Sequence, residues 1–165
     1  MSPRHTFDPT AVSSTLEVFP KGDYLVSVGE PKAFQGTTKS GKNEGNANWG
    51  IRWGCKIERV LEGDPNAVSK RLIYTGYLNN EEAAGFPKQF VMAALGYPIN
   101  AKGEREFNEA MQGQDWDYDT ESGACGDVWR QTTGKTLIIS LDVQPDDQRP
   151  GEFRQKIVRF RPVSA

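Results

Sequence analysis

The 165-residue sequence has little histidine, little cysteine and no long hydrophobic run. Its one histidine, His5, and its two distant cysteines, Cys55 and Cys125, are too few for a Cys/His zinc site within one chain. No run approaches the roughly 20 apolar residues that span a bilayer, and the N-terminus lacks the apolar core of a secretory signal. These absences predict a cytoplasmic protein with two free thiols, and a Cys55–Cys125 disulfide is the alternative.

Catalytic signatures are also absent. The sequence has no G-x-S-x-G motif, and a lone histidine near the N-terminus gives no convincing catalytic triad. The aspartates of DWDYDTESG begin like a calcium loop, but Thr120 stands where glycine is required and Gly126 where the bidentate glutamate belongs. We therefore expect a protein that is not an enzyme and has no cofactor and no metal. A metal-dependent nuclease ranks third among the functions considered.

The segment GTTKSGKN, residues 36–43, resembles the phosphate-binding loop of nucleotide hydrolases. Asn43 replaces the Ser or Thr that would hold magnesium, and the following NEGNANWG is too rich in glycine and asparagine to form the required helix. We interpret residues 36–48 as a loop between strands. Its lysines, Lys39 and Lys42, are candidates for contacting a phosphodiester backbone, and the alternative is that they only keep the loop soluble.

Short apolar runs between turn signals follow a polar, flexible N-terminus at residues 1–15. Alternation predicts strands within 16–34, with a bulge or an edge at Pro31, and over 48–63, 70–78, 134–145 and 151–163. Helical spacing predicts a helical segment within 79–98, which Pro87 divides into a short turn and the main helix, and a second helix over 104–112.

This order predicts a mostly β, single domain over residues 16–165. Three strands, a helix and two strands are typical of the OB-fold, a Greek-key β-barrel that binds oligonucleotides on its second and third strands. An acidic insert covers about residues 101–127. A split sheet packed on helices is the alternative fold, because element order does not determine strand pairing.

Basic and aromatic residues share the predicted second, third and last strands. Proteins that hold single strands combine cationic grooves with aromatic rings on which bases stack. Alternation assigns Trp53 to the core and makes Trp49, beside the lysine loop, the better stacking residue; of Tyr74 and Tyr77, which face opposite sides, at most one stacks. The candidate nucleic-acid-binding residues are Lys39, Lys42, Trp49, Arg52, Lys56, Arg71, Tyr74, Arg154 and Arg159. The alternative is an ordinary solvent-exposed face.

The insert between the main helix and the fourth strand is strongly acidic, although the net charge of the whole chain is only −2. One hypothesis is that this segment mimics DNA and competes for the basic groove, or recruits a partner protein. Deletion of residues 112–126 is then expected to tighten nucleic-acid binding.

Several segments resemble a family of phage-encoded single-stranded-DNA-binding proteins found among replication and recombination genes. They are GDYLVSV, TKSGK, WGCKIERVLEGD with KRLIYTGYL, and GKTLIISLDVQ with EFRQKIVRFRPV, which together span residues 22–162. The resemblance implies an OB-type barrel that coats single strands in the host cytoplasm, with replication or recombination proteins as partners. The chain ends in RFRPVSA, without the acidic, phenylalanine-tipped tail of many phage single-strand binders.

The leading prediction is thus a single-stranded-DNA-binding protein. A viral adaptor or inhibitor that binds a protein through the acidic insert is the alternative. Exposed strand edges of an incomplete barrel also make a homo-oligomer plausible.

Overall fold

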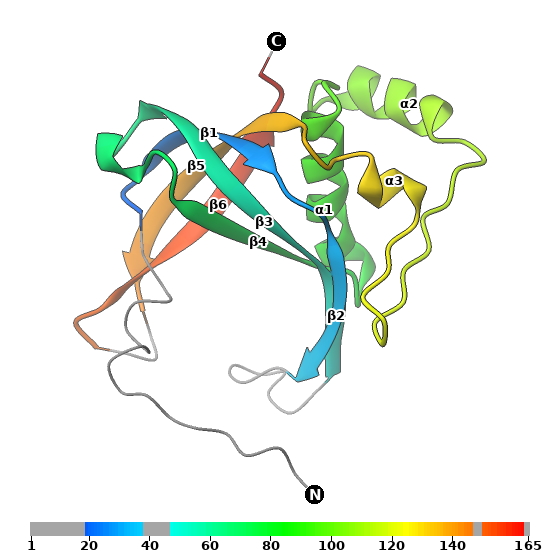
Figure 1. The fold of residues 1–165 in the computed structure, drawn as a ribbon, viewed down its shortest axis with the longest axis horizontal. Helices are drawn as coiled ribbons and strands as arrows, with labels where there is room; N and C mark the ends of the chain where they lie inside the picture. Colours follow the sequence, from blue (N-terminus) through cyan, green and yellow to red (C-terminus); the bar gives the residue numbers. More distant parts are fainter. Residues whose placement is uncertain (1–18, 38–46, 147–149, 164–165) are drawn as a thin grey trace, which may run out of the picture.

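A computed structural model describes residues 19–37, 47–146 and 150–163 (Figure 1). The strands are β1 (Gly22–Val28), β2 (Lys32–Thr37), β3 (Ala47–Glu62), β4 (Arg71–Tyr77), β5 (Thr136–Pro145) and β6 (Phe153–Arg161). The helices are α1 (Glu81–Ala94), α2 (Ala101–Ala110) and α3 (Asp127–Arg130), with a 3₁₀ turn at Pro65–Ala67. Figure 1 shows the helices gathered on one side of the strands.

All six strands belong to one antiparallel sheet, which confirms the prediction of a mostly β fold. The long strand β3 pairs along one edge with β2 and then with β1, and along its other edge with β4. Strand β1 also pairs with β5, and β5 pairs with β6. Pro31 lies at the break between β1 and β2, where a bulge is predicted.

The predicted β-barrel is not closed, because β4 and β6 do not pair within the described chain and the sheet is open. Aromatic side chains fill the space between these two strands. Tyr74 of β4 and Phe160 of β6 have ring centroids 4.9 Å apart, and Phe86 of α1 lies 4.7 Å from Phe160. Rings from α1 therefore pack where a closing strand pair would have to form.

Strand β3 shows why the sheet has one buried face. Ile51, Trp53, Cys55 and Ile57 are fully buried, whereas Arg52, Lys56 and Glu58 are exposed. The period of two puts alternate side chains on opposite faces. The indole of Trp53 packs against Tyr74 and Phe90, so the assignment of Trp53 to the core is confirmed.

Helix α1 begins after Asn80, whose side chain accepts a hydrogen bond from the Ala83 N–H at 2.7 Å. Pro87 lies inside one continuous helix and does not divide it, contrary to the prediction. Its ring packs over β4, where a Cβ added to Gly76 would lie 2.7 Å from Pro87 Cγ. The helix thus continues through a residue that cannot donate a backbone hydrogen bond, and the ring of this residue lies against the sheet.

The acidic insert is part of the hydrophobic core. Phe107 of α2, Trp116 and Trp129 form a chain of edge-to-face rings with centroids 5.7 and 5.3 Å apart. The Trp129 indole N–H donates to the Trp116 carbonyl at 2.8 Å. The backbone N–H of Ala33 donates to the Gly123 carbonyl at 3.0 Å, so the insert also covers the edge of β2. Its charged side chains are exposed on the surface.

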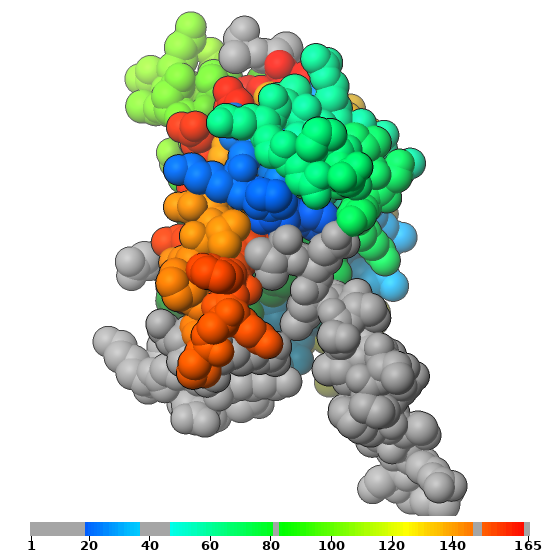
Figure 2. All heavy atoms as spheres, turned by 90° about the vertical axis from the view of Figure 1, so that its left-hand side faces the viewer, coloured from blue at the N-terminus to red at the C-terminus, as the bar shows by residue number. Residues whose placement is uncertain are grey.

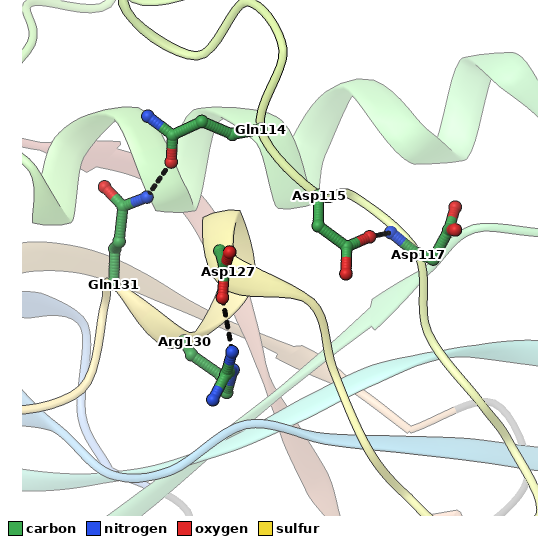
Figure 3. Close-up of polar contacts among 6 residues, drawn as sticks. All are labelled: Gln114, Asp115, Asp117, Asp127, Arg130 and Gln131. Carbon is green, nitrogen blue, oxygen red and sulfur yellow. Dashed lines mark hydrogen bonds and ion pairs between the residues drawn. The ribbon is translucent and has the colours of Figure 1, made fainter.

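Local polar contacts shape the rest of the insert (Figure 3). An oxygen of Asp115 accepts a hydrogen bond from the Asp117 N–H at 2.8 Å, Gln131 donates to Gln114, and Arg130 pairs with Asp127. These carboxylates hold turns and a helix end. Over the described ranges, no group of three histidine, cysteine, aspartate or glutamate side chains is placed to hold a metal ion.

Both cysteines are free thiols, as predicted, with Cys55 buried and Cys125 half-buried. Burial raises the pKa of the Cys55 thiol to about 12. Among the helices of the described segments, none combines the length and the apolar character needed to cross a bilayer.

Candidate nucleic-acid interface

The side of β2, β3 and β4 that points away from the core carries basic and aromatic side chains. Strand register aligns them in three rows across β3. Gly50 lies between Phe34 and Tyr77, Arg52 lies between Lys32 and Thr75, and Lys56 lies opposite Arg71. We call the surface formed by Lys32, Phe34, Arg52, Lys56, Arg71, Ile73, Thr75 and Tyr77 the outer face.

Three cations predicted to contact phosphates lie together on this face. Arg52, Lys56 and Arg71 are all exposed, and none makes an ion pair with a carboxylate of the described residues. The carboxylate of Glu58, two residues along β3 from Lys56, accepts a hydrogen bond from the Ser27 hydroxyl at 2.7 Å. The face therefore has a local positive charge in a chain whose net charge is −2.

Two cations, Lys56 and Arg71, face each other across β3 and β4, which does not favour the stability of the sheet. Lys56 and Arg71 are direct cross-strand partners. Like charges placed directly opposite each other destabilise a sheet, and an ordinary solvent face would more often place a carboxylate at one of the two positions. Their juxtaposition makes the site attractive to an anion.

An aromatic pair occupies the row at Gly50. The rings of Phe34 and Tyr77 meet edge-to-face with centroids 5.8 Å apart, and the guanidinium carbon of Arg52 lies 4.7 Å from the Phe34 centroid. Gly50 leaves no side chain between the rings, and a Cβ there would lie 1.9 Å from the Gly76 carbonyl oxygen. Tyr77 is 43% exposed, so its ring is accessible to a ligand.

Arg52 is held in place at this row. Besides its contact with the Phe34 ring, its Nε donates to the Thr75 hydroxyl at 3.4 Å. A guanidinium beside an exposed ring, Tyr77, and a half-buried ring, Phe34, can bind a phosphate while a base contacts the rings. This arrangement combines the two chemical functions that binding of single strands requires.

The burial of Tyr74 contradicts its predicted role in stacking on a base. Only 4% of the residue is exposed, and its ring stacks on Trp53 within the core. Burial raises the pKa of its hydroxyl, which has no hydrogen-bond partner among the described residues. The tyrosine on the opposite face of β4, Tyr77, is the one that reaches the surface.

Of the remaining predicted residues, those that the structure describes do not join the outer face. Trp49 is half-buried and has the same strand parity as the core residues Ile51 and Trp53. Lys39 and Lys42 lie outside the described residues.

Arg154 and Arg159 lie on β6, from which β4 is separated by β5, β1 and β3 in the sheet order. Figure 2 shows the same separation, with β1 (blue) between the β5–β6 hairpin (orange) and the end of the β3–β4 hairpin (green). Arg159 Nε donates to the Ser140 hydroxyl at 3.3 Å, and Ser140 donates to Asp23 at 2.6 Å. Arg159 therefore belongs to a network that contains a carboxylate.

Sequence reasoning missed the aromatic pair. The alternation of β4 places Tyr77 and Tyr74 on opposite faces of the strand. To decide which of the two is exposed, one must know which face of β4 is buried. Phe34 lies 43 positions from Tyr77 in the chain (77 − 34 = 43). Only the registers of β2 and β4 on β3 bring the two rings together.

No protein-family model matches the chain, and no curated protein matches it either.

Proposed function

We propose that this protein binds single-stranded DNA without catalysis and holds the strand on the outer face. The supporting observation is the juxtaposition of Arg52, the Phe34–Tyr77 ring pair and the Lys56–Arg71 pair on one exposed surface. Cations and accessible rings in one place are the common features of proteins that bind single strands without reading their sequence.

We further propose that the open sheet follows the strand order of the OB-fold, with β1 followed by β2 as its bent first strand. The OB-fold is a five-stranded, partly open Greek-key barrel that binds oligonucleotides on the face of its second and third strands. In this chain those strands are β3 and β4, which carry Arg52, Lys56, Arg71 and Tyr77. The helix that follows the third strand is α1.

Accessible rings favour a single strand over a duplex as the ligand. A base can stack on Phe34 or Tyr77 only when its own face is free, and in a duplex both faces are covered by neighbouring base pairs. The resemblance to phage single-stranded-DNA-binding proteins agrees with this preference. It favours a role in replication or recombination, where single strands are exposed.

The test is a titration of a fluorescein-labelled oligonucleotide, single-stranded or duplex, followed by anisotropy at two salt concentrations with magnesium present. The variant R52A/K56A/R71A is compared with K102A/R105A/K135A, which removes three exposed cations elsewhere. Each lost phosphate contact lowers the salt slope for a single strand by about 0.7. We expect the first variant to lose most of the salt-dependent binding and the second to bind like the wild type.

The other outcomes separate the alternatives. Equal losses in the two variants would mean that the outer face is not the site. Cleavage of the oligonucleotide would indicate a nuclease, and no binding at either salt concentration would favour a protein-binding adaptor.

A further inference from the structure

Gly54 provides space for the charged group of Arg71. The two residues lie on neighbouring strands of the outer face, where Gly54 is the cross-strand partner of Ile73 and Lys56 is the partner of Arg71. A Cβ added to Gly54 would lie 2.7 Å from Nη2, 3.2 Å from Nε and 3.3 Å from Cζ of Arg71. The guanidinium thus fills the volume that a side chain at position 54 would occupy.

This placement brings the charge of Arg71 over β3. Its Cα lies on β4, an edge strand of the sheet, but its guanidinium reaches back across the central strand β3, which also carries Lys56. No carboxylate of the described chain forms an ion pair with either residue. Two cations are therefore concentrated at one end of the outer face, and neither forms an ion pair with a carboxylate of the described residues.

The two ends of the outer face differ in chemistry. The Phe34–Tyr77 ring pair flanks Gly50, and the Lys56–Arg71 pair lies six residues further along β3 (56 − 50 = 6). At about 3.3 Å per residue, the two ends are about 20 Å apart. A stacked strand has one phosphate per about 3.4 Å, so about six nucleotides cover this length, and fewer do so when the strand is extended.

We propose that Lys56 and Arg71 together bind one phosphate group of the strand, and that Gly54 is the positioning residue for Arg71. The bound strand then runs along β3 from this phosphate site to the Phe34–Tyr77 rings. This inference rests on the proposed function, because it assigns the ends of the same binding face. Gly54 acts only through Arg71. The phosphate site and the aromatic site are far enough apart to act independently.

The test is a pair of double-mutant cycles with a nine-nucleotide single strand. G54A keeps every charge but displaces the Arg71 guanidinium, and we expect it to weaken binding by about tenfold, as R71A does. The double variant G54A/R71A is expected to bind no more weakly than R71A. The matched control is G85A in α1, where an added Cβ meets no atom within 4 Å, and it should bind like the wild type.

The second cycle combines R71A with Y77A. Sites more than about 10 Å apart with no shared partner have additive effects, so we expect the fold-losses of the two variants to multiply. The dependence of binding affinity on salt concentration, the salt slope, gives a further readout, because a residue with a purely structural role would not change it. Because Lys56 and Arg71 share one phosphate, the loss of both in K56A/R71A should lower it by about 0.7, whereas Y77A should leave it unchanged.

Three results would overturn the inference: wild-type binding by G54A, a loss in G54A that multiplies with that of R71A, or strong non-additivity between R71A and Y77A. Thermal unfolding of each variant shows whether a loss of binding reflects a loss of folding. Failure of the proposed function is a different result, since the wild-type protein would then not bind the oligonucleotide at all.

Discussion

Trp53 and Tyr74 stack in the core with ring centroids 5.6 Å apart and an angle of only 6° between their planes. The two residues are direct cross-strand partners on β3 and β4. This stack joins the two strands on the buried face, opposite the outer face that carries the candidate site. Mutations on the two faces of the same strand pair should therefore separate stability from binding.

On the buried face, Y74F should leave the protein as stable as the wild type or more stable, by up to about 1 kcal/mol. The Tyr74 hydroxyl is buried without a partner in the described residues, and an unsatisfied polar group carries a desolvation penalty. Y74A should lower the free energy of unfolding by about 3–5 kcal/mol, because it leaves a cavity between Trp53 and Phe160. Urea unfolding measures both, and a large destabilisation by Y74F would show that its hydroxyl is satisfied.

On the outer face, F34A and Y77A should each weaken binding to single-stranded DNA by about 1–3 kcal/mol, because each removes a ring on which a base stacks. Their effect on stability should be smaller than that of Y74A. Phe153 of β6 is 59% exposed and outside the outer face, so F153A is the matched control. Equal losses for F153A and Y77A would assign the aromatic contribution to general surface hydrophobicity.

The insert should prove necessary for folding. W116A should lower the free energy of unfolding by about 3 kcal/mol, because the indole packs between Phe107 and Trp129. Deletion of residues 112–126 should destabilise the protein at least as much. Tighter DNA binding by a stably folded deletion variant would support the hypothesis that the insert competes for the groove.

Asp119 should make stability depend on acid pH. Its pKa is lowered, chiefly by the hydrogen bond from the Glu121 N–H at 2.9 Å and also by a hydrogen bond from the Ser122 side chain. A depressed pKa in the folded state means that this contribution is fully present above the unfolded pKa and is lost as pH falls through the folded pKa. Unfolding of the wild type and D119N between about pH 2 and 6 should show a smaller loss of stability in the variant; parallel curves would contradict the prediction.

The two thiols should react with a thiol reagent at very different rates. Burial raises the pKa of Cys55 to about 12, so almost none of it is thiolate near neutral pH. Burial also raises the pKa of Cys125, but that residue is only partly covered. At pH 8 we expect Cys125 to react first and Cys55 to react only on unfolding. Rapid reaction of native C125S would show that Cys55 is accessible.

Local patterns in the sequence predicted much of the fold. The alternation around Trp53 identified β3 and its buried face, and helical spacing within residues 79–98 identified α1. The open sheet could not be predicted in the same way, because it depends on rings of α1 that pack between β4 and β6. That contact joins residues that are far apart in the chain. The alternation of the strands would be the same in an open sheet and in a closed barrel.

The candidate site was predictable only in part for a related reason. The alternation of side chains placed Arg52 and Lys56 on the exposed face of one strand. The pairing of β3 with β4 then brings Arg71 to the same face. The partner of Tyr77, Phe34, comes from a strand whose register could not be read from its own residues. The composition of the insert also did not predict its tryptophan contacts, which attach the acidic segment to the core.

The hydrogen bond between Ala33 and Gly123 has a consequence for the energetics of recognition. Strand β2 is paired with β3 on one side and is joined on the other side to the insert by this bond. Phe34, the next residue along the chain, is thus presented from a backbone that is already immobilised on both sides. The cost of ordering this part of the protein backbone, which is one of the free-energy costs of binding, is therefore already met in the free protein.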